Sequence, residues 1–470
     1  MSTRPSGTRP RVTVYVPCAT YGRFLAQCLD SVARQSLGDW ELLVIDDGSV
    51  DATAEVAARF AAAHPDRVRV HRHAQPQGLR ACANFAIEHA RGELVMRLDA
   101  DDWLDESALE VLASWLDRHP QVGLVYPNWV WVDAAGEVLG VERRARPGVE
   151  SQVADLPAHG ACTMVRRRVL KAIGGYELDL PAQDGHELWL KTVHRFGVGH
   201  VETPLFFYRQ HGHSLSSNES RLLSARREIK SRAAAAARGP VGLRIAAVVP
   251  IRNDYPHAPN LALAPLAGRP LVDYTLDMVR DNPLFDAVVI TTDDAAVSEH
   301  CRRRGNWHVH QRSSELCDSE VRLENVIRDA VTGLTAETGF DPDLLVVLSC
   351  HTPLRRRDQI NEAVDTLLLY PVDQVISTWE IHDLYFRHGA EGMQAVNAGA
   401  VHALRNEREA LFGCNGSIHV LWRQVLDAGG YLRGRIGHIV MTREESLLAK
   451  KSEERVVLES ILQAHRLAGW

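Results

Sequence analysis

The chain has 470 residues, 45% of them hydrophobic and 24% charged, with a formal net charge of −7 at pH 7. That length predicts two or three domains, and the negative balance argues against the basic surface by which proteins hold nucleic acid. No apolar run reaches the roughly 20 residues that cross a bilayer, and the polar N-terminus does not resemble a secretory signal, so we expect a cytoplasmic protein without an integral membrane segment. The eight cysteines include no Cys-x-x-Cys pair, which predicts reduced thiols and no zinc site.

The first half of the chain alternates short apolar runs with helical patterns. Strands are predicted over 11–17, 42–45, 68–71 and 93–98, with helices over 25–35, 51–64 and 79–90. This alternation predicts a parallel, doubly wound sheet, in which ligands bind beyond the carboxyl ends of the strands.

The alternation stops at residues 214–238, where a polar stretch precedes a charged, alanine-rich one without an apolar face. We predict a surface helix there, inside a helical linker over 218–242. Further on, strands are predicted over 243–250, 287–292 and 344–349, and helices over 271–282 and 295–304. The predicted fold class is therefore α/β, with two tandem Rossmann-like domains over 10–217 and 243–470.

Two acidic clusters follow predicted strands of the first half. Asp46 and Asp47 end one strand, where a carboxylate can accept hydrogen bonds from a uracil or a ribose; an ordinary turn that caps the next helix uses the same residue types. Asp99 and Asp101 flank Ala100 after another strand. Paired carboxylates there can hold Mg²⁺ or Mn²⁺ against a diphosphate, although such strings also occur in solvated turns. Their position after an apolar strand favours the metal site.

A third cluster surrounds Asp184, which is expected at or near the start of a helix. A helix N-terminus lowers the pKa of a carboxyl group and keeps it ionised, as a general base requires. The alternative is an N-cap, a position that aspartate often occupies. His186 and Glu187 are rival candidates for the base.

Taken in order, these clusters resemble glycosyltransferase family 2, a group of nucleotide-sugar enzymes with the GT-A fold. Asn84 and the segments 77–79 and 90–93 match the stretch before the family's metal motif, and 208–216 resembles its closing segment. The resemblance covers residues 12–218 and implies a transferase that moves a sugar from a nucleotide donor, which we expect to be a UDP-sugar. It further implies Mn²⁺ or Mg²⁺ as the cofactor, and the acceptor we expect is a small molecule or glycan.

The resemblance also implies roles for individual residues. Asp46 or Asp47 would contact the nucleoside, while Asp99 and Asp101 would hold the donor phosphate and the metal. His211 would be a further metal ligand. The other expected donor-binding residues are Pro17, Asn84, Arg91, Ala100 and Arg209.

Asp184 matches the family's catalytic base, which takes the proton of the acceptor hydroxyl. A single base, with attack from the face opposite the leaving group, predicts inversion at the anomeric carbon. Two positions depart from the family's pattern: residues 17–20 lack the frequent Tyr-Asn pair, and Gln183 stands where an acidic residue usually precedes the base.

The second half, over residues 244–462, resembles the CMP-sialic acid synthetase group of sugar nucleotidyltransferases. That resemblance implies a cytidylyltransferase-like α/β domain, in which a vestigial nucleotide site would include Arg252, Asp293 and Asn415. The segments that carry the resemblance are 249–252, 265–271, 289–294, 352–355 and 415–418.

Two segments of this half lack the features that such catalysis needs. Residues 253–260 contain no glycine or lysine and two prolines, where backbone amides should cradle a triphosphate. Residues 449–453 place lysines where carboxylates should bind magnesium. We therefore expect this half to be non-catalytic and to serve scaffolding or homodimerisation. The alternatives are a bifunctional enzyme that also makes a CMP-sugar, and a nucleotide-binding pseudoenzyme or scaffold.

Overall fold

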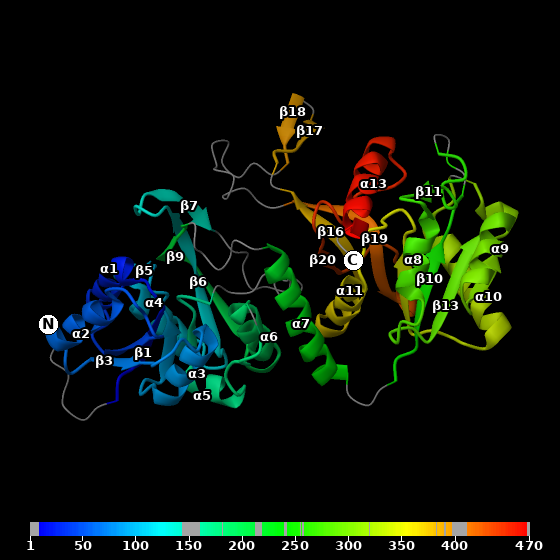
Figure 1. Ribbon diagram of the computed structural model, residues 1–470. Helices are drawn as coiled ribbons and strands as arrows, with labels where there is room; N and C mark the ends of the chain where they lie inside the picture. The colour runs from blue at the N-terminus through cyan, green and yellow to red at the C-terminus, as the bar shows by residue number, and fades with distance from the viewer. Residues whose placement is uncertain are drawn as a thin grey trace. The chain divides into compact units, whose positions relative to one another are not determined.

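The computed structural model describes residues 9–142, 160–180, 182–211, 219–238, 242–253, 255, 258–318, 320–381, 383–389, 392–396 and 411–467. The chain divides into two compact units, residues 1–229 with 382–409 and residues 230–381 with 410–470 (Figure 1). None of the helices in the described ranges combines the length and apolar character needed to cross a membrane.

The first unit is built on a nine-stranded sheet in the order β3-β2-β1-β4-β8-β6-β9-β5, with β7 paired to β6. The strands from β3 to β4 are parallel, as predicted. They alternate in sequence with helices, and their apolar side chains are almost entirely buried between layers. Their bounds are β1 (Val12–Cys18), β2 (Trp40–Asp46), β3 (Val68–Arg72) and β4 (Leu94–Arg97).

The rest of this sheet is mixed, so the parallel arrangement predicted from the first strands does not extend over the whole sheet. β8 (Met164–Arg166) runs antiparallel to both β4 and β6 (Leu124–Val132), and β7 (Val138–Glu142) is antiparallel to β6. The connection between β6 and β7 is far shorter than the dozen or more residues that a parallel crossover requires. β9 (Val198–Arg209) is parallel to β6 and antiparallel to β5 (Trp103–Leu104).

Six helices of the first unit connect these strands. They bury one apolar face each: α1, for example, buries Leu25, Leu29 and Val32. The carboxyl ends of β1, β2 and β4 lie next to one another in the sheet, so the loops that follow them share one edge. The helices are α1 (Gly22–Ala33), α2 (Thr53–Ala63), α3 (Leu79–His89), α4 (Ala108–Arg118), α5 (Arg167–Ala172) and α6 (Asp184–Phe196).

The second unit has a seven-stranded sheet in the order β14-β13-β10-β15-β19-β16-β20. Four strands are parallel, among them the three predicted over 243–250, 287–292 and 344–349, and β19 (Leu411–Trp422) runs antiparallel to both of its neighbours. β16 (Gln374–Ile381) and β20 (Ile436–Val440) are parallel to each other. The four parallel strands are β10 (Ile245–Pro250), β13 (Ala287–Thr292), β14 (His308–Gln311) and β15 (Leu344–Leu348).

Helices again connect the strands of the second unit, and the α/β fold class predicted for both halves is confirmed. The helices are α8 (Leu271–Val279), α9 (Ala295–Arg304), α10 (Leu323–Thr338), α11 (Arg357–Leu369), α12 (Arg423–Asp427) and α13 (Ser452–Leu467), with a 3₁₀ turn, η2 (Ser314–Leu316). Two short ribbons complete the described elements: β11 (Pro265–Leu266) with β12 (Arg269–Pro270), and β17 (Phe386–Gly389) with β18 (Gly392–Ala395).

The predicted helix between the halves is present as α7 (Glu219–Arg238), but it is not a plain surface helix. Ala225, Ile229 and Ala234 are buried, and so is Lys230, which pairs with Glu362 of α11 at 3.1 Å. Alanines contribute little to a hydrophobic pattern, so a narrow buried face made mainly of alanine was not recognised in the sequence. The boundary between the two units falls inside this helix.

Candidate active site

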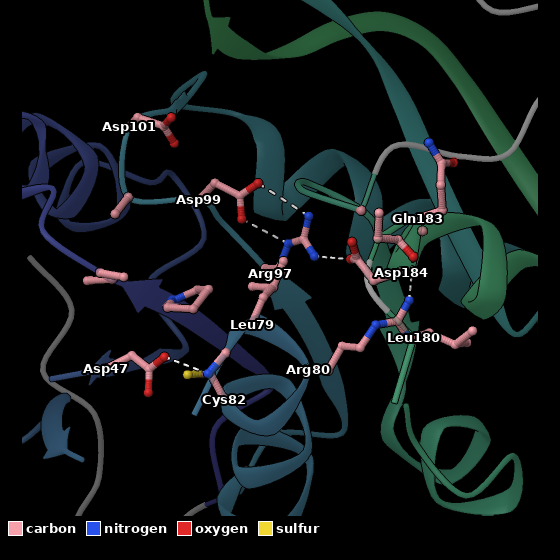
Figure 2. A pocket seen from close by; sticks show the side chains of 18 of the residues that line it. Asp47, Leu79, Arg80, Cys82, Arg97, Asp99, Asp101, Leu180, Gln183 and Asp184 are labelled. Atoms are coloured by element: carbon pink, nitrogen blue, oxygen red, sulfur yellow. Dashed lines mark hydrogen bonds and ion pairs between the residues drawn. The ribbon is translucent and has the colours of Figure 1, made fainter. Parts of the chain in front are cut away.

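A cavity of about 740 Å³ lies at the carboxyl edge of the parallel strands of the first unit (Figure 2). This volume is within the range of pockets that hold small molecules and cofactors. The loops after β1, β2 and β4 contribute to it, together with the first turns of α3 and α6. Of the predicted site residues, the cavity is lined by Pro17, Asp47, Asp99, Ala100, Asp101 and Asp184.

Asp47 is held by hydrogen bonds from the loop before α3. Its Oδ1 accepts from the backbone N–H of Gln77 and its Oδ2 from that of Gly78, both at 2.8 Å, and Oδ1 lies 2.7 Å from His73 Nδ1. Burial alone would raise the pKa of Asp47, but these hydrogen bonds lower it. Asp47 is therefore an ionised carboxylate with a fixed orientation at the cavity wall.

Asp46, the other candidate for the nucleoside, has a different environment. Its side chain is fully buried, accepts from the Ser49 N–H at 2.9 Å and lies 3.2 Å from Arg72 Nε. It is not among the residues that line the cavity. The interpretation as an ordinary capped turn therefore fits Asp46, whereas Asp47 faces the cavity.

Asp101 and His211 come together as expected for a metal site. Oδ2 of Asp101 lies 2.9 Å from Nε2 of His211, whose ring lies close to those of Tyr21 and Phe24. Asp101 also lines the cavity. Residues 212–216 of the predicted closing segment lie outside the described residues.

Arg97 is a site residue that the sequence analysis missed. Its buried guanidinium lies between Asp99 and Asp184 and forms ion pairs with both, with Nε 2.9 Å from Asp99 Oδ1 (Figure 2). The available signal was a basic residue at the end of the otherwise apolar strand β4. Gly160 covers this pair: a Cβ at that position would clash with Arg97 Nη2 and lie 2.8 Å from Asp184 Oδ2.

The two carboxyl groups that share Arg97 have opposite pKa shifts. Burial raises the pKa of Asp99 to about 6; Arg97 opposes this, while the charges of Asp101 and Asp184 add to it. Burial would also raise the pKa of Asp184, but the charge of Arg97, its hydrogen bond and the charge of Arg80 together lower it. Asp184 is therefore ionised at neutral pH, and it is the first residue of α6, as predicted.

Glu187, another candidate for the base, forms ion pairs and a hydrogen bond with other residues of the protein. It is buried, pairs with Arg80, accepts from the Glu177 N–H at 2.9 Å and lies 2.6 Å from Lys191 Nζ. These contacts position α6 and the loop before it. His186, the other rival, is buried and lines the cavity.

Arg209 does not line the cavity, although a donor-binding role was predicted. Its guanidinium donates to the carbonyls of Asp101 and Ala134, both at 2.9 Å, and to Gln27 Oε1 at 2.8 Å. It also lies over the rings of Phe24 and Trp103. These contacts support the loop that carries Asp101, so Arg209 is a positioning residue.

Asn84 and Arg91 also lie outside the cavity lining. The Asn84 amide pairs with the backbone of Tyr176, since Nδ2 donates to its carbonyl and Oδ1 accepts from its N–H, both at 2.8 Å. Arg91 precedes β4, at the edge of the sheet opposite the cavity, and its side chain is 61% exposed beside Glu41. The sequence alone did not show that residues before β4 lie at the opposite edge of the sheet from the residues that follow it.

Part of the cavity lining is aromatic and apolar, and we call this part the aromatic wall. Trp131 and Tyr208 lie there in a T-shaped arrangement with ring centroids 4.9 Å apart. The helix α7 contributes Leu222 and Arg226, and Arg226 donates to Gln183 Oε1 at 3.4 Å. The remaining apolar residues of this wall are Trp129, Leu178 and Leu180.

Of the predicted nucleotide residues of the second unit, Asn415 has its side chain engaged within the protein. Asn415 is buried: its Oδ1 accepts from Ser377 Oγ at 2.5 Å and its Nδ2 donates to Ser446 Oγ at 2.9 Å. The guanidinium of Arg252 lies 5.4 Å from the ring centroid of Tyr255. Asp293 accepts from Gln311 Nε2 through its backbone carbonyl at 3.2 Å. Residues 254, 256 and 257 of the altered loop lie outside the described residues.

Lys450 lies close to the first loops of this second sheet. Burial lowers the pKa of His351 to about 4, and the charge of Lys450 adds to this effect. His351 Nε2 in turn lies 2.7 Å from the hydroxyl of Tyr255. The segment 449–453 therefore places a positive charge close to His351.

Two family models match the chain. Residues 13–174 match "Glycosyl transferase family 2" and residues 246–379 match "Cytidylyltransferase". The two matches fall on the first and the second sheet.

Curated relatives match part of the chain. The putative glycosyltransferase EpsE of Bacillus subtilis is 29% identical over 170 residues, which cover 36% of this chain and 60% of that protein. The PGL/p-HBAD biosynthesis glycosyltransferase Rv2957 of Mycobacterium tuberculosis is 36% identical over 118 residues, 25% of this chain and 46% of that protein. The chain thus spans about half the length of the curated relatives it matches.

Solved structures resemble the chain only over about half its length. TarS 1-349 of S. aureus in complex with UDP-GlcNAc has a TM-score of 0.42 and 17% identity, covering 49% of this chain and 68% of that one. The mannosyltransferase PcManGT of Pyrobaculum calidifontis in complex with GDP-Man and Mn²⁺ has a TM-score of 0.38 and 23% identity, covering 50% and 66%.

Proposed function

The chain carries a glycosyltransferase family 2 domain over residues 13–174 and a cytidylyltransferase domain over residues 246–379, and from this we propose that its first unit is an inverting glycosyltransferase. The donor is a nucleotide-sugar, a UDP-sugar in our proposal, and the acceptor is a hydroxyl of a small molecule or glycan. One observation carries the proposal: Asp47, Asp101 and Asp184 come from separate segments and line one cavity large enough for such a donor.

The residues around Asp101 fit a divalent cation. Asp101 offers a carboxylate oxygen at the cavity wall, and His211 offers an imidazole nitrogen 2.9 Å away. Carboxylate oxygen and imidazole nitrogen suit Mn²⁺, and the carboxylate also suits Mg²⁺. When bound, the ion offsets the charge that develops on the departing nucleoside diphosphate.

The part of the cavity near Asp47 is where we place the nucleoside. The side chain of Asp47 is ionised and oriented by the 77–78 backbone, so it can accept hydrogen bonds from a base or ribose without first reorganising. Pro17 and Ala100 line the same cavity and offer small surfaces against which flat groups can pack. Arg97, beside Asp99, adds positive charge near the expected diphosphate.

Asp184 is the base in this proposal. Its Oδ2 is engaged by Arg97, so Oδ1 is the oxygen that would take the proton of the acceptor hydroxyl. The ion pair fixes the orientation of the carboxylate and keeps it ionised before the acceptor arrives. The role of Arg97 is therefore positioning, and Gly160 leaves the space for it.

The aromatic wall indicates where the acceptor lies. Trp131 and Tyr208 line the same cavity as Asp184, and aromatic rings pack well on the apolar face of a sugar or on an aglycone. A sugar or small aglycone hydroxyl bound on this wall would be directed towards the base.

The test is hydrolysis and transfer with a panel of UDP-, GDP- and CMP-sugars, with and without Mn²⁺. We expect metal-dependent release of UDP by the wild type and a loss of at least about 100-fold in Asp101→Ala, because one stabilising contact to the leaving group is removed. Asp293→Asn in the second unit is the matched control and should retain full activity. Equal, metal-independent release by wild type and Asp101→Ala would refute the site.

For the second unit we propose a non-catalytic role in scaffolding or homodimerisation. Support comes from the internal hydrogen bonds of Asn415 and from the positive charge of Lys450 near His351. Incubation with CTP and a sugar acid should release no pyrophosphate, and sedimentation of the full chain should give a dimer. Pyrophosphate release would instead favour the bifunctional alternative, and a monomer would remove the dimerisation role.

A further inference from the structure

Three side chains that suit a transition metal lie together in the second unit, far in sequence from the transferase residues. His308 and His310 are two residues apart on β14, so their side chains share one face of the strand, and Glu337 lies on α10, which packs against it. One ligand atom from each of the three lies within 4.8 Å of the others. His308 Nδ1 lies 3.5 Å from Glu337 Oε2.

Within the described part of the chain, each of the two imidazoles keeps a ring nitrogen that can bind a ligand. Nε2 of His308 is buried and has no hydrogen-bond partner there. Nε2 of His310 lies 2.8 Å from Asp329 Oδ2, which leaves Nδ1 as the nitrogen for a ligand. A carboxylate on the far nitrogen is the usual companion of a metal-binding histidine, because it fixes the tautomer and the ring orientation.

The helix opposite the strand accommodates this arrangement. Asp329, Gly333 and Glu337 are four residues apart in turn, so they lie on one face of α10. A Cβ at position 333 would clash with Nδ1 and Cε1 of the His310 ring. Glycine therefore lets the ring lie against the helix, with one carboxylate a turn before it and another a turn after.

We propose that His308, His310 and Glu337 bind a divalent transition metal, with Zn²⁺ as the ion that fits them best. Two imidazole nitrogens and one carboxylate oxygen are a frequent zinc ligand set, and solvent would supply the fourth ligand because Glu337 is 66% exposed. The nitrogen ligands disfavour Mg²⁺. The ion would join β14, the edge strand of its sheet, to α10 and so stabilise that edge.

The test is zinc binding by the full chain, measured by titration calorimetry and by metal content after dialysis. We expect one equivalent bound by the wild type, and at least tenfold weaker binding in Glu337→Gln and in the double variant His308→Ala/His310→Ala. Asp329→Asn should weaken binding by about 10- to 100-fold, because it changes only the residue that orients His310. His300→Ala, which removes another histidine paired with an aspartate in the same unit, is the matched control.

Zinc could also bind to Asp47, His73 and Cys82 in the first unit, so Cys82→Ser is measured in parallel. Loss of the zinc equivalent in Cys82→Ser, with full binding in Glu337→Gln and the double variant, would overturn the proposal, and so would a wild type that binds no zinc. Glu337 is exposed, so Glu337→Gln is expected to fold even where the double variant does not. A rise in melting temperature with Zn²⁺ that Mg²⁺ does not produce is expected in the wild type and in His300→Ala, and not in Glu337→Gln.

Discussion

The two sheets of this protein begin alike and differ in what their polar residues contact. In the first unit, Asp47, Asp99 and Asp101 follow parallel strands and line a cavity. In the second, Asn253 follows the parallel strand β10 and donates to Asp294 at 2.7 Å, while Asn415 lies within β19 and is enclosed by serines. Polar residues at a strand end thus indicate function only when their hydrogen-bonding groups face a cavity.

The largest expected effect comes from the base of the first unit. Asp184→Asn keeps the shape of the side chain but cannot take a proton, and we expect transfer to fall about 10³-fold, or about 4 kcal/mol in the barrier. The measurement is kcat for transfer at saturating donor, with Asp293→Asn as the control from the second unit. Activity within threefold of wild type would show that another residue is the base.

We expect acid to destabilise the second unit because it contains a buried histidine. Burial lowers the pKa of His419 to about 4, while unfolded histidine titrates near 6.5. Between these values the unfolded chain binds a proton that the folded chain does not, so stability falls as pH falls from 6.5 to 4, by up to about 3 kcal/mol. Urea unfolding of the second unit at pH 7 and pH 4.5 measures this loss.

His419→Gln should reduce that pH dependence, since glutamine has no proton to bind and can keep a hydrogen bond to Gln374. Asp99 of the first unit contributes a pH dependence of the opposite sign. Its pKa is raised to about 6, so the folded chain binds the proton more tightly than the unfolded chain, and the stability from this group rises as the pH falls. An unchanged slope in His419→Gln would assign the acid sensitivity of the second unit to other groups.

A smaller effect is expected from a substitution of Gly160, which lies against the ion pair of Arg97 with Asp184. Gly160→Ala introduces a Cβ that displaces Arg97 or Asp184, and we expect kcat to fall about 10- to 100-fold with donor binding nearly unchanged. Product formation and donor affinity, measured separately, check this split. An equal loss in both would indicate general damage to the fold; Gly242→Ala, at a position with open space, is the control.

Asn415→Ala in the second unit should affect stability and leave transfer unchanged. The substitution removes the two hydrogen bonds between Asn415 and the buried hydroxyls of Ser377 and Ser446, and we expect this loss to cost about 1–3 kcal/mol. Chemical denaturation measures the cost, and the transfer assay tests the separation of roles. Reduced transfer in the folded variant would contradict the assignment of chemistry to the first unit alone.

The smallest effect is expected for Arg91→Ala. Arg91 lies at the sheet edge opposite the cavity and its side chain is mostly exposed, so donor affinity and turnover should stay within about twofold of wild type. A tenfold loss of donor affinity would restore the donor-binding role that sequence order predicted.

The sequence was informative about the strands and the acidic residues that follow them. Apolar runs identified β1, β2 and β4, and the carboxyl-edge rule predicted that Asp47, Asp99 and Asp101 would share one edge. These inferences depend on local pattern and on one general property of parallel sheets.

The local sequence pattern could not predict interactions between segments that are distant in the sequence. The pair of Arg97 with Asp184 joins residues 87 positions apart, and Arg209 reaches Gln27 across 182 positions. The local sequence does not show whether an arginine side chain contacts a ligand or other residues of the protein. The same limit explains why α7 was not expected to form part of the cavity wall.

The helix α7 has a consequence for how these two domains could have been joined. Leu222 and Arg226, in its first part, belong to the cavity of the transferase unit, and Lys230, in its second, is fully buried against Glu362 of the other unit. An exposed linker tolerates insertions, whereas this helix has buried side chains on both sides of residue 229, such as Ala225 and Ala234. Recombination that replaces the second domain would therefore have to retain the chain up to that residue, or rebuild part of the acceptor wall.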